Sequence, residues 1–140
     1  MKRALTLALV IAALATSCKK KDETKTETKT DILAKSAWTV DSYGVDVNND
    51  LMLTGVEDET KPCDRDNTYS FSANGTLVRN NGSLKCSSEP NTDTGNWQFY
   101  LNETKLDIFG NTYFIKTLTS NRLELYSPGP ASNAIFILKR

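Results

Sequence analysis

Residues 96–101 read Asn-Trp-Gln-Phe-Tyr-Leu, and this stretch predicts a β-strand with one face on a hydrophobic core. Trp97, Phe99 and Leu101 recur at every second position, the period that places side chains on one face of a strand. Residues 122–127 repeat the pattern with two leucines between polar neighbours. A period of two favours antiparallel strands that bury one face and expose the other.

The same pattern recurs along the rest of the chain in short apolar runs, separated by turn residues at intervals of about 8 to 12 residues. The expected strands are 37–45, 68–72, 76–80, 96–101, 105–109, 112–119, 122–127 and 134–139. Residues that favour tight turns stand between several of these runs and predict hairpins; they are Asn74-Gly75, Asn102-Glu103, Gly110-Asn111 and Ser120-Asn121.

Short links between consecutive strands predict an all-β fold. We expect an eight-stranded antiparallel up-and-down barrel, with a two-sheet sandwich as the alternative, because closure of the sheet removes its exposed edges. Residues 31–35, Asp-Ile-Leu-Ala-Lys, are expected to form a short N-terminal helical turn at one end, capped by Thr30 or Asp31.

The first 18 residues have the pattern of a secretory signal: two basic residues, an apolar run over 4–15 and small residues before Cys18. The run is shorter than the roughly 20 residues of a membrane-spanning helix. Residues 14–18, Leu-Ala-Thr-Ser-Cys, resemble the lipobox of bacterial lipoproteins, in which a peptidase cuts before a lipidated cysteine. The resemblance implies lipidation of Cys18 and an anchor in the outer membrane of a bacterial cell envelope, facing the periplasm or the surface. An ordinary secretory signal is the alternative.

The chain then divides by composition. Residues 22–30 have no apolar side chain and predict a solvated tether. We expect a signal peptide over 1–17, a lipidated cysteine and disordered tether over 18–30, and one domain over 31–140. The domain holds ten basic and fourteen acidic residues, a net charge of −4, which gives no reason to expect a nucleic-acid partner. We expect a monomer.

The chain has no histidine. This absence removes the Ser-His-Asp and Cys-His nucleophile systems, the commonest general base near neutral pH and all histidine-based metal sites. The remaining Asp, Glu, Ser and Lys residues form no recognisable catalytic motif. We therefore expect a protein that is not an enzyme and that carries no cofactor and no metal.

Cys63 and Cys86 remain as a pair once Cys18 is assigned to lipid, and the expected compartment permits disulfides. If Asn74-Gly75 is a two-residue turn, the register of the hairpin places the two cysteines opposite each other. Gly82 should then introduce a bulge, or the strands should fray there. We predict a structural disulfide; a reactive thiol pair or a metal site are the alternatives.

Residues 46–57 place oxygen-bearing side chains at positions 1, 3, 5, 9 and 12 of a loop that resembles an EF-hand calcium loop. Position 6, where glycine permits the sharp turn, is Leu51, and no helical pattern flanks the segment. An Asx-rich loop is therefore favoured over a calcium site, and the sequence does not decide between them.

A longer resemblance covers nearly all of residues 31–140. Its residues are 63–76 (Cys-Asp-Arg-Asp-Asn-Thr-Tyr-Ser-Phe-Ser-Ala-Asn-Gly-Thr), Gly82, Cys86, 95–97 (Gly-Asn-Trp) and 113–119 (Tyr-Phe-Ile-Lys-Thr-Leu-Thr), with Leu123 and Leu125. Together they resemble the lipocalin-like domain of bacterial lipoproteins. The resemblance implies a small eight-stranded barrel and, by analogy, a small apolar ligand in its mouth. The ligand-binding candidates on the expected inward face are Trp38, Tyr69, Phe71, Trp97, Phe99 and Ile115, for each of which core packing is the competing role.

The leading functional hypothesis is a lipid-anchored envelope barrel that binds a small hydrophobic ligand by burying its apolar surface. The alternative is a protein-interaction module, such as an inhibitor of an envelope or wall-degrading enzyme, with a filled barrel and an exposed apolar or acidic patch.

Overall fold

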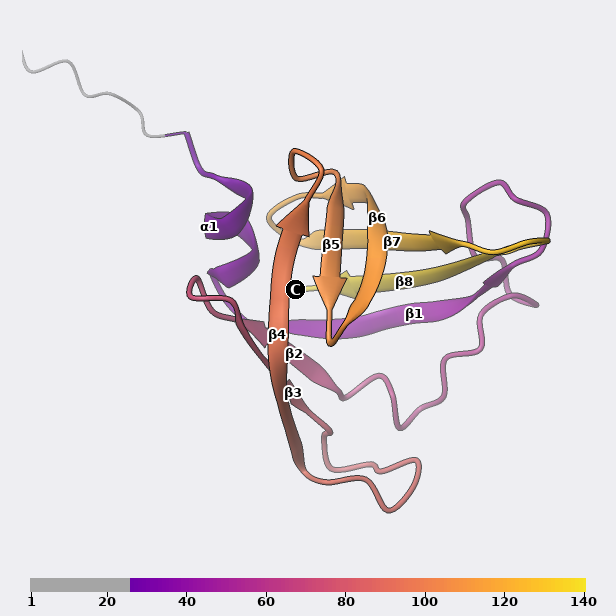
Figure 1. Ribbon diagram of the computed structural model, residues 1–140. Helices are drawn as coiled ribbons and strands as arrows, with labels where there is room; N and C mark the ends of the chain where they lie inside the picture. The colour runs from indigo at the N-terminus through magenta and orange to yellow at the C-terminus, as the bar shows by residue number, and fades with distance from the viewer. Residues whose placement is uncertain (1–25) are drawn as a thin grey trace, which may run out of the picture.

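The computed structural model describes residues 26–140, so the signal peptide, Cys18 and most of the expected tether lie outside the described residues. One antiparallel sheet of eight strands closes into a barrel-like ring, because each strand pairs with the next and β8 pairs with β1 (Figure 1). The elements are α1 (Lys29–Ala34), β1 (Trp38–Asp46), β2 (Thr68–Phe71), β3 (Thr76–Asn80), β4 (Thr92–Tyr100), β5 (Lys105–Ile108), β6 (Asn111–Leu118), β7 (Arg122–Pro128) and β8 (Asn133–Lys139).

The expected all-β class, the up-and-down order of eight antiparallel strands and the short N-terminal helix are confirmed. Among the described helices, none is long and apolar enough to cross a membrane.

Two boundaries differ from the prediction for local reasons. The helix α1 begins at Lys29 because Thr28, and not Thr30 or Asp31, is its N-cap: the Thr28 hydroxyl and the Asp31 carboxylate each accept from the other residue's backbone amide in a capping box. β4 begins at Thr92, four residues early, because its polar start pairs with β3 as far as Asn80.

Two turns also differ. The β2–β3 hairpin has a three-residue loop, 73–75, and Gly75 has a positive φ of 87° that suits glycine. Leu101, expected on the inward face, lies instead in the β4–β5 turn with a φ of 47° and is 66% exposed. The turn begins one residue earlier than predicted because Tyr100 pairs with Lys105.

The predicted pairing of Cys63 and Cys86 is confirmed, since the two residues lie at disulfide distance with 5.3 Å between their Cα atoms. The predicted ladder between them is wrong, because β2 starts at Thr68 and β3 ends at Asn80. The three-residue loop shifts the register by one position, and the strands separate before Gly82, which matches the expected fraying. The disulfide therefore links two loops beyond the hairpin.

One end of the ring is closed by α1, by the start of β1 and by the residue that follows β8. The side chain of Trp38, at the start of β1, is fully buried, and its Nε1 donates to the Leu33 carbonyl oxygen at 3.0 Å. The guanidinium of Arg140, just after β8, lies 3.8 Å from the centroid of the Trp38 ring. Its Nη2 donates to the carbonyl oxygens of Ile32 at 2.6 Å and Leu33 at 2.9 Å, so the last helical turn is satisfied.

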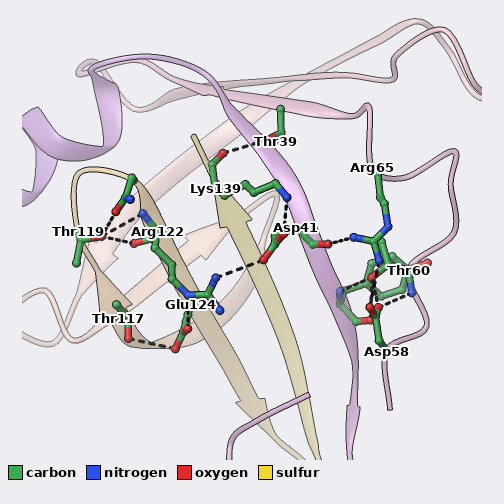
Figure 2. A network of polar contacts seen from close by, with 12 residues as sticks. Thr39, Asp41, Asp58, Thr60, Arg65, Thr117, Thr119, Arg122, Glu124 and Lys139 are labelled. Atoms are coloured by element: carbon green, nitrogen blue, oxygen red, sulfur yellow. Dashed lines mark hydrogen bonds and ion pairs between the residues drawn. The ribbon is translucent and has the colours of Figure 1, made fainter. Parts of the chain in front are cut away.

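The outer face of the seam between β7, β8 and β1 carries a network of charges centred on Asp41 (Figure 2). Asp41 accepts from Lys139 at 2.6 Å and from Arg122 at 3.3 Å, and its backbone carbonyl oxygen accepts from Arg65. The hydrogen bond from Lys139 is the main cause that lowers the pKa of Asp41. Since Arg65 also pairs with Asp58, the network ties the long β1–β2 loop to the sheet.

Gly44 is where the β1–β2 loop crosses closest to the sheet. Its backbone forms a bridge with Asp58, and a Cβ atom at Gly44 would lie 1.8 Å from the backbone carbonyl oxygen of Glu57. Glycine is therefore required for this approach, which fixes the path of the loop.

We expect the Gly44→Ala variant to lose about 1–3 kcal/mol of unfolding free energy, because the new methyl group must displace backbone. Urea unfolding of the oxidised protein measures this loss. The matched control is Gly55→Ala in the same loop, where a Cβ atom meets nothing within 4 Å, and we expect a change below about 0.5 kcal/mol. Equal effects of the two substitutions would contradict the close approach.

Candidate functional site

A cavity of about 720 Å³ lies at the end of the ring away from α1. Tyr43 and Val45, late in β1, and Ala134, early in β8, line it, whereas Trp38 and Arg140 lie at the opposite ends of those two strands. Tyr43 lies five positions after Trp38 along β1, roughly 17 Å at the usual rise of a strand. The ring is thus sealed and packed at one end and hollow at the other.

Aromatic side chains from five places in the chain line the cavity; they are Tyr43, Tyr69, Phe109, Tyr113 and Phe136. The rings of Tyr69 and Phe136 pack edge to face, with 5.5 Å between their centroids. Burial raises the pKa of both Tyr69 and Tyr113, so their hydroxyls stay protonated. The lining offers apolar contact with a few neutral donors, which is typical of small-molecule sites.

One ion pair is part of the cavity wall. Arg79 and Asp93 are direct neighbours across β3 and β4, and Nε of Arg79 donates to Oδ2 of Asp93 at 3.0 Å. A terminal guanidinium nitrogen donates to the same oxygen. Burial acts to lower the pKa of Arg79, but hydrogen bonds to Asp93 and Tyr69 outweigh it, and the pKa is raised. The two charges therefore balance each other within the wall.

Tyr43 connects the cavity to the disulfide region. Its hydroxyl donates to Oδ2 of Asp64 at 3.0 Å, and Asp64 directly follows Cys63. Burial is the main cause that raises the pKa of Tyr43 to about 12, with further contributions from Asp64, Glu59 and Asp58. The backbone amide of Glu59 donates to the Tyr43 carbonyl oxygen at 2.9 Å. This bond places Glu59, an exposed residue, at the rim of the cavity.

The six candidates from the sequence divide among three places. Tyr69 belongs to the buried core and also lines the cavity; Trp38, Phe71 and Trp97 are buried in the same core, with Phe99 and Ile115 packed against it. Trp97 and Phe99 line a second hollow of about 530 Å³ that Thr30 also borders. A role in ligand contact stays a prediction for all six, and the structure brings only Tyr69 to the large cavity.

Sequence reasoning missed Tyr43 and Arg79. Strict alternation from Trp38 places Tyr43 on the outer face, but the register shifts between Val40 and Ser42, and this irregularity turns Tyr43 into the cavity. Arg79 follows the inward alternation of Leu77, whereas the predicted inward residues are all aromatic or aliphatic. The alternation was the available signal for Arg79, whereas nothing in the sequence marks the shift in β1.

Phe109 forms part of the mouth in an unfavourable backbone conformation. It has a φ of 53° and, with Gly110 at 81°, makes the two-residue turn between β5 and β6, one residue earlier than predicted. Positive φ is a genuine outlier for a bulky side chain. Its ring fills the space beside Gly95, where a Cβ atom would lie 2.3 Å from the Phe109 ring.

In the loop over residues 46–57, the buried carboxylates accept hydrogen bonds from backbone amides of the same loop. Asp46, fully buried, accepts from the amides of Asp50 and Leu51 and from the Asn133 side chain. Burial acts to raise the pKa of Asp46, but these hydrogen bonds outweigh it and lower the pKa. Glu57 accepts from the amides of Val47 and Thr54, and the Thr54 bonds are the main cause that lowers its pKa. The geometry is that of an Asx-rich loop.

Among residues 26–140, one group of potential metal ligands lies close together: Cys63, Asp64 and Cys86. The two sulfurs are joined to each other, and a disulfide offers no thiolate to a metal. Asp64 is also engaged by Tyr43 and by the Lys61 amide. The group therefore acts as a structural link.

Compared with models of protein families and with curated proteins, the chain matches none of them.

We expect Phe109→Asn to change the unfolding free energy by less than about 1 kcal/mol. Asparagine tolerates positive φ and Asn-Gly is the favoured sequence for this turn, which offsets the lost ring contacts. Phe71→Ala, in the core, should lose about 3–5 kcal/mol. Urea unfolding compares the two. A loss for Phe109→Asn as large as that for Phe71→Ala would show that the ring is an ordinary core residue.

Proposed function

We propose that this chain is a lipid-anchored binding protein of the bacterial cell envelope, with a lipocalin-like barrel that holds a small, largely apolar ligand. The observation that carries the proposal is the cavity of about 720 Å³ at the unsealed end of the ring. Its volume lies within the usual range of about 300–1,000 Å³ for small-molecule sites. Five aromatic residues line it, although an eight-stranded ring is narrow enough for side chains to fill it.

Binding would act through burial of apolar ligand surface against these rings, at about 25 cal/mol per Å² removed from water. The protonated hydroxyls of Tyr69 and Tyr113 and the Arg79–Asp93 pair would orient a ligand by hydrogen bonds. The proposal is for binding without catalysis, since the charged pair in the wall is mutually satisfied and serves to orient.

The position of α1 is compatible with an N-terminal lipid anchor. The described chain enters through α1, which lies at the sealed end of the ring (Figure 1). A lipid on Cys18 would therefore attach the domain through the end of the ring that lies opposite the cavity. Acyl chains contribute roughly 0.8 kcal/mol per buried methylene, so several chains hold such an anchor stably.

The uncharged dye N-phenyl-1-naphthylamine tests the binding proposal. We expect its fluorescence to rise with the oxidised protein and the Ala134→Trp variant to weaken binding by at least about tenfold, or ~1.4 kcal/mol, because the indole fills the mouth. The matched control, Ala131→Trp, changes an exposed alanine in the β7–β8 turn and should leave binding unchanged.

A folded protein that binds no dye would contradict a ligand-binding role. It would favour the protein-interaction alternative, for which the structure offers one observation: Val47, Met52 and Val56 in the β1–β2 loop are 65%, 58% and 95% exposed. Loops with several exposed apolar side chains are typical of protein contacts.

The anchor is tested by metabolic labelling with radioactive palmitate in a bacterial host. We expect the full-length chain to be labelled and to sediment with membranes, and the Cys18→Ser variant to lose both properties, because serine cannot form the thioether. Ser17→Ala keeps a small residue before the cysteine and is the control that should remain labelled. Labelling that persists in Cys18→Ser would rule out the anchor.

A further inference from the structure

The residues that line the cavity carry one more negative than positive charge, and the extra carboxylate lies at the rim. Among the described residues, the cavity lining has two carboxylates, Glu59 and Asp93, and one guanidinium, Arg79. Arg79 directs two of its nitrogens to one oxygen of Asp93, so these two charges cancel. Among the described residues, none forms an ion pair with Glu59, so the negative charge of this exposed residue at the rim has no neutralising cation beside it.

The position of Glu59 is set by the backbone. Its amide donates to the Tyr43 carbonyl oxygen at 2.9 Å, and the preceding residue, Asp58, bridges to Gly44 in β1. The side of the rim around Tyr43 is acidic, because Asp64 accepts the Tyr43 hydroxyl. Asp58 lies nearby and is paired with Arg65. The backbone of Glu59 is thus fixed beside an aromatic wall, and its exposed carboxylate lies close enough to contribute to the raised pKa of Tyr43.

The second observation is the density of aromatic rings. Tyr43, Tyr69, Phe109, Tyr113 and Phe136 share one cavity, and the faces of such rings attract positive charge. An aromatic lining beside an unpaired carboxylate is complementary to an organic ammonium group. The same carboxylate would repel an anionic group, and the charge of Arg79, the guanidinium in the lining, is already balanced by Asp93.

We infer that the ligand of this cavity is an organic cation, an apolar body that carries an ammonium head, with the head beside Glu59 at the rim and the body among the aromatic rings. The inference rests on the proposed function, since it names the ligand class of the same cavity. The binding free energy then has two contributions. Burial of apolar surface favours any hydrophobic probe, whereas attraction to Glu59 and to the ring faces favours only a cation.

Three probes of similar size separate these terms: phenyltrimethylammonium, its uncharged isostere tert-butylbenzene and the anion benzenesulfonate. We expect the cation to bind the oxidised protein about fivefold or more tightly than the neutral isostere and the anion to bind most weakly. Glu59→Gln should weaken cation binding about two- to fivefold, the range of a partly exposed charge pair, and leave the neutral probe unchanged. NMR-detected titration at low salt measures all three dissociation constants.

The control variant is Glu103→Gln, which removes the same charge from the exposed β4–β5 turn and should leave the order and strength of binding unchanged. Neutral or anionic probes that bind as tightly as the cation, or a Glu59→Gln variant that keeps the full preference, would overturn the cation inference and leave the cavity as a binding site. A folded protein that binds none of the three probes would overturn the inference and the proposed function together.

Discussion

The stacking of Arg140 on Trp38 joins the start of β1, the end of β8 and the helix at one point. A buried cation–π contact contributes about 2 kcal/mol or more. The same guanidinium donates to Ile32 and Leu33, which offsets the burial that lowers the pKa of Arg140. A helix of six residues is not stable alone in water, so α1 depends on tertiary contacts for its place, among them these bonds from Arg140 and the fully buried Leu33. Because α1 closes one end of the ring, the cavity opens only at the other end of the described domain.

The interior changes character along the axis of the ring. The sealed half is filled by apolar side chains, among them Leu33, Leu123 and Leu138, which are fully buried. The other half has Ala134 at an inward position and the Arg79–Asp93 pair in its wall. Small and paired polar residues replace leucines there, and this exchange creates the cavity. Phe109 narrows the mouth at the expense of an unfavourable backbone conformation, which fits a role in the site.

Most of the fold was predictable because period-two alternation and turn residues act locally. The strands at 76–80 and 134–139 agree with β3 and β8 almost to the residue. Local patterns failed where tertiary pairing decides: the polar start of β4 is a strand only because β3 pairs with it, and the register shift after Val40 turns Tyr43 inward. The candidate site was predicted only in part, since Tyr69 follows the alternation, whereas a charged Arg79 and an exposed Glu59 become significant only when distant strands and loops meet.

Two-dimensional ¹H–¹⁵N NMR of the oxidised protein with N-phenyl-1-naphthylamine shows whether the unsealed end of the ring is the binding site. We expect chemical-shift changes at the backbone amides of Tyr43, Val45 and Phe136, around the cavity, and none at Leu33 or Trp38, in the sealed end. Shifts confined to the sealed end, shifts around the hollow at Trp97, or no shifts at any amide would contradict it.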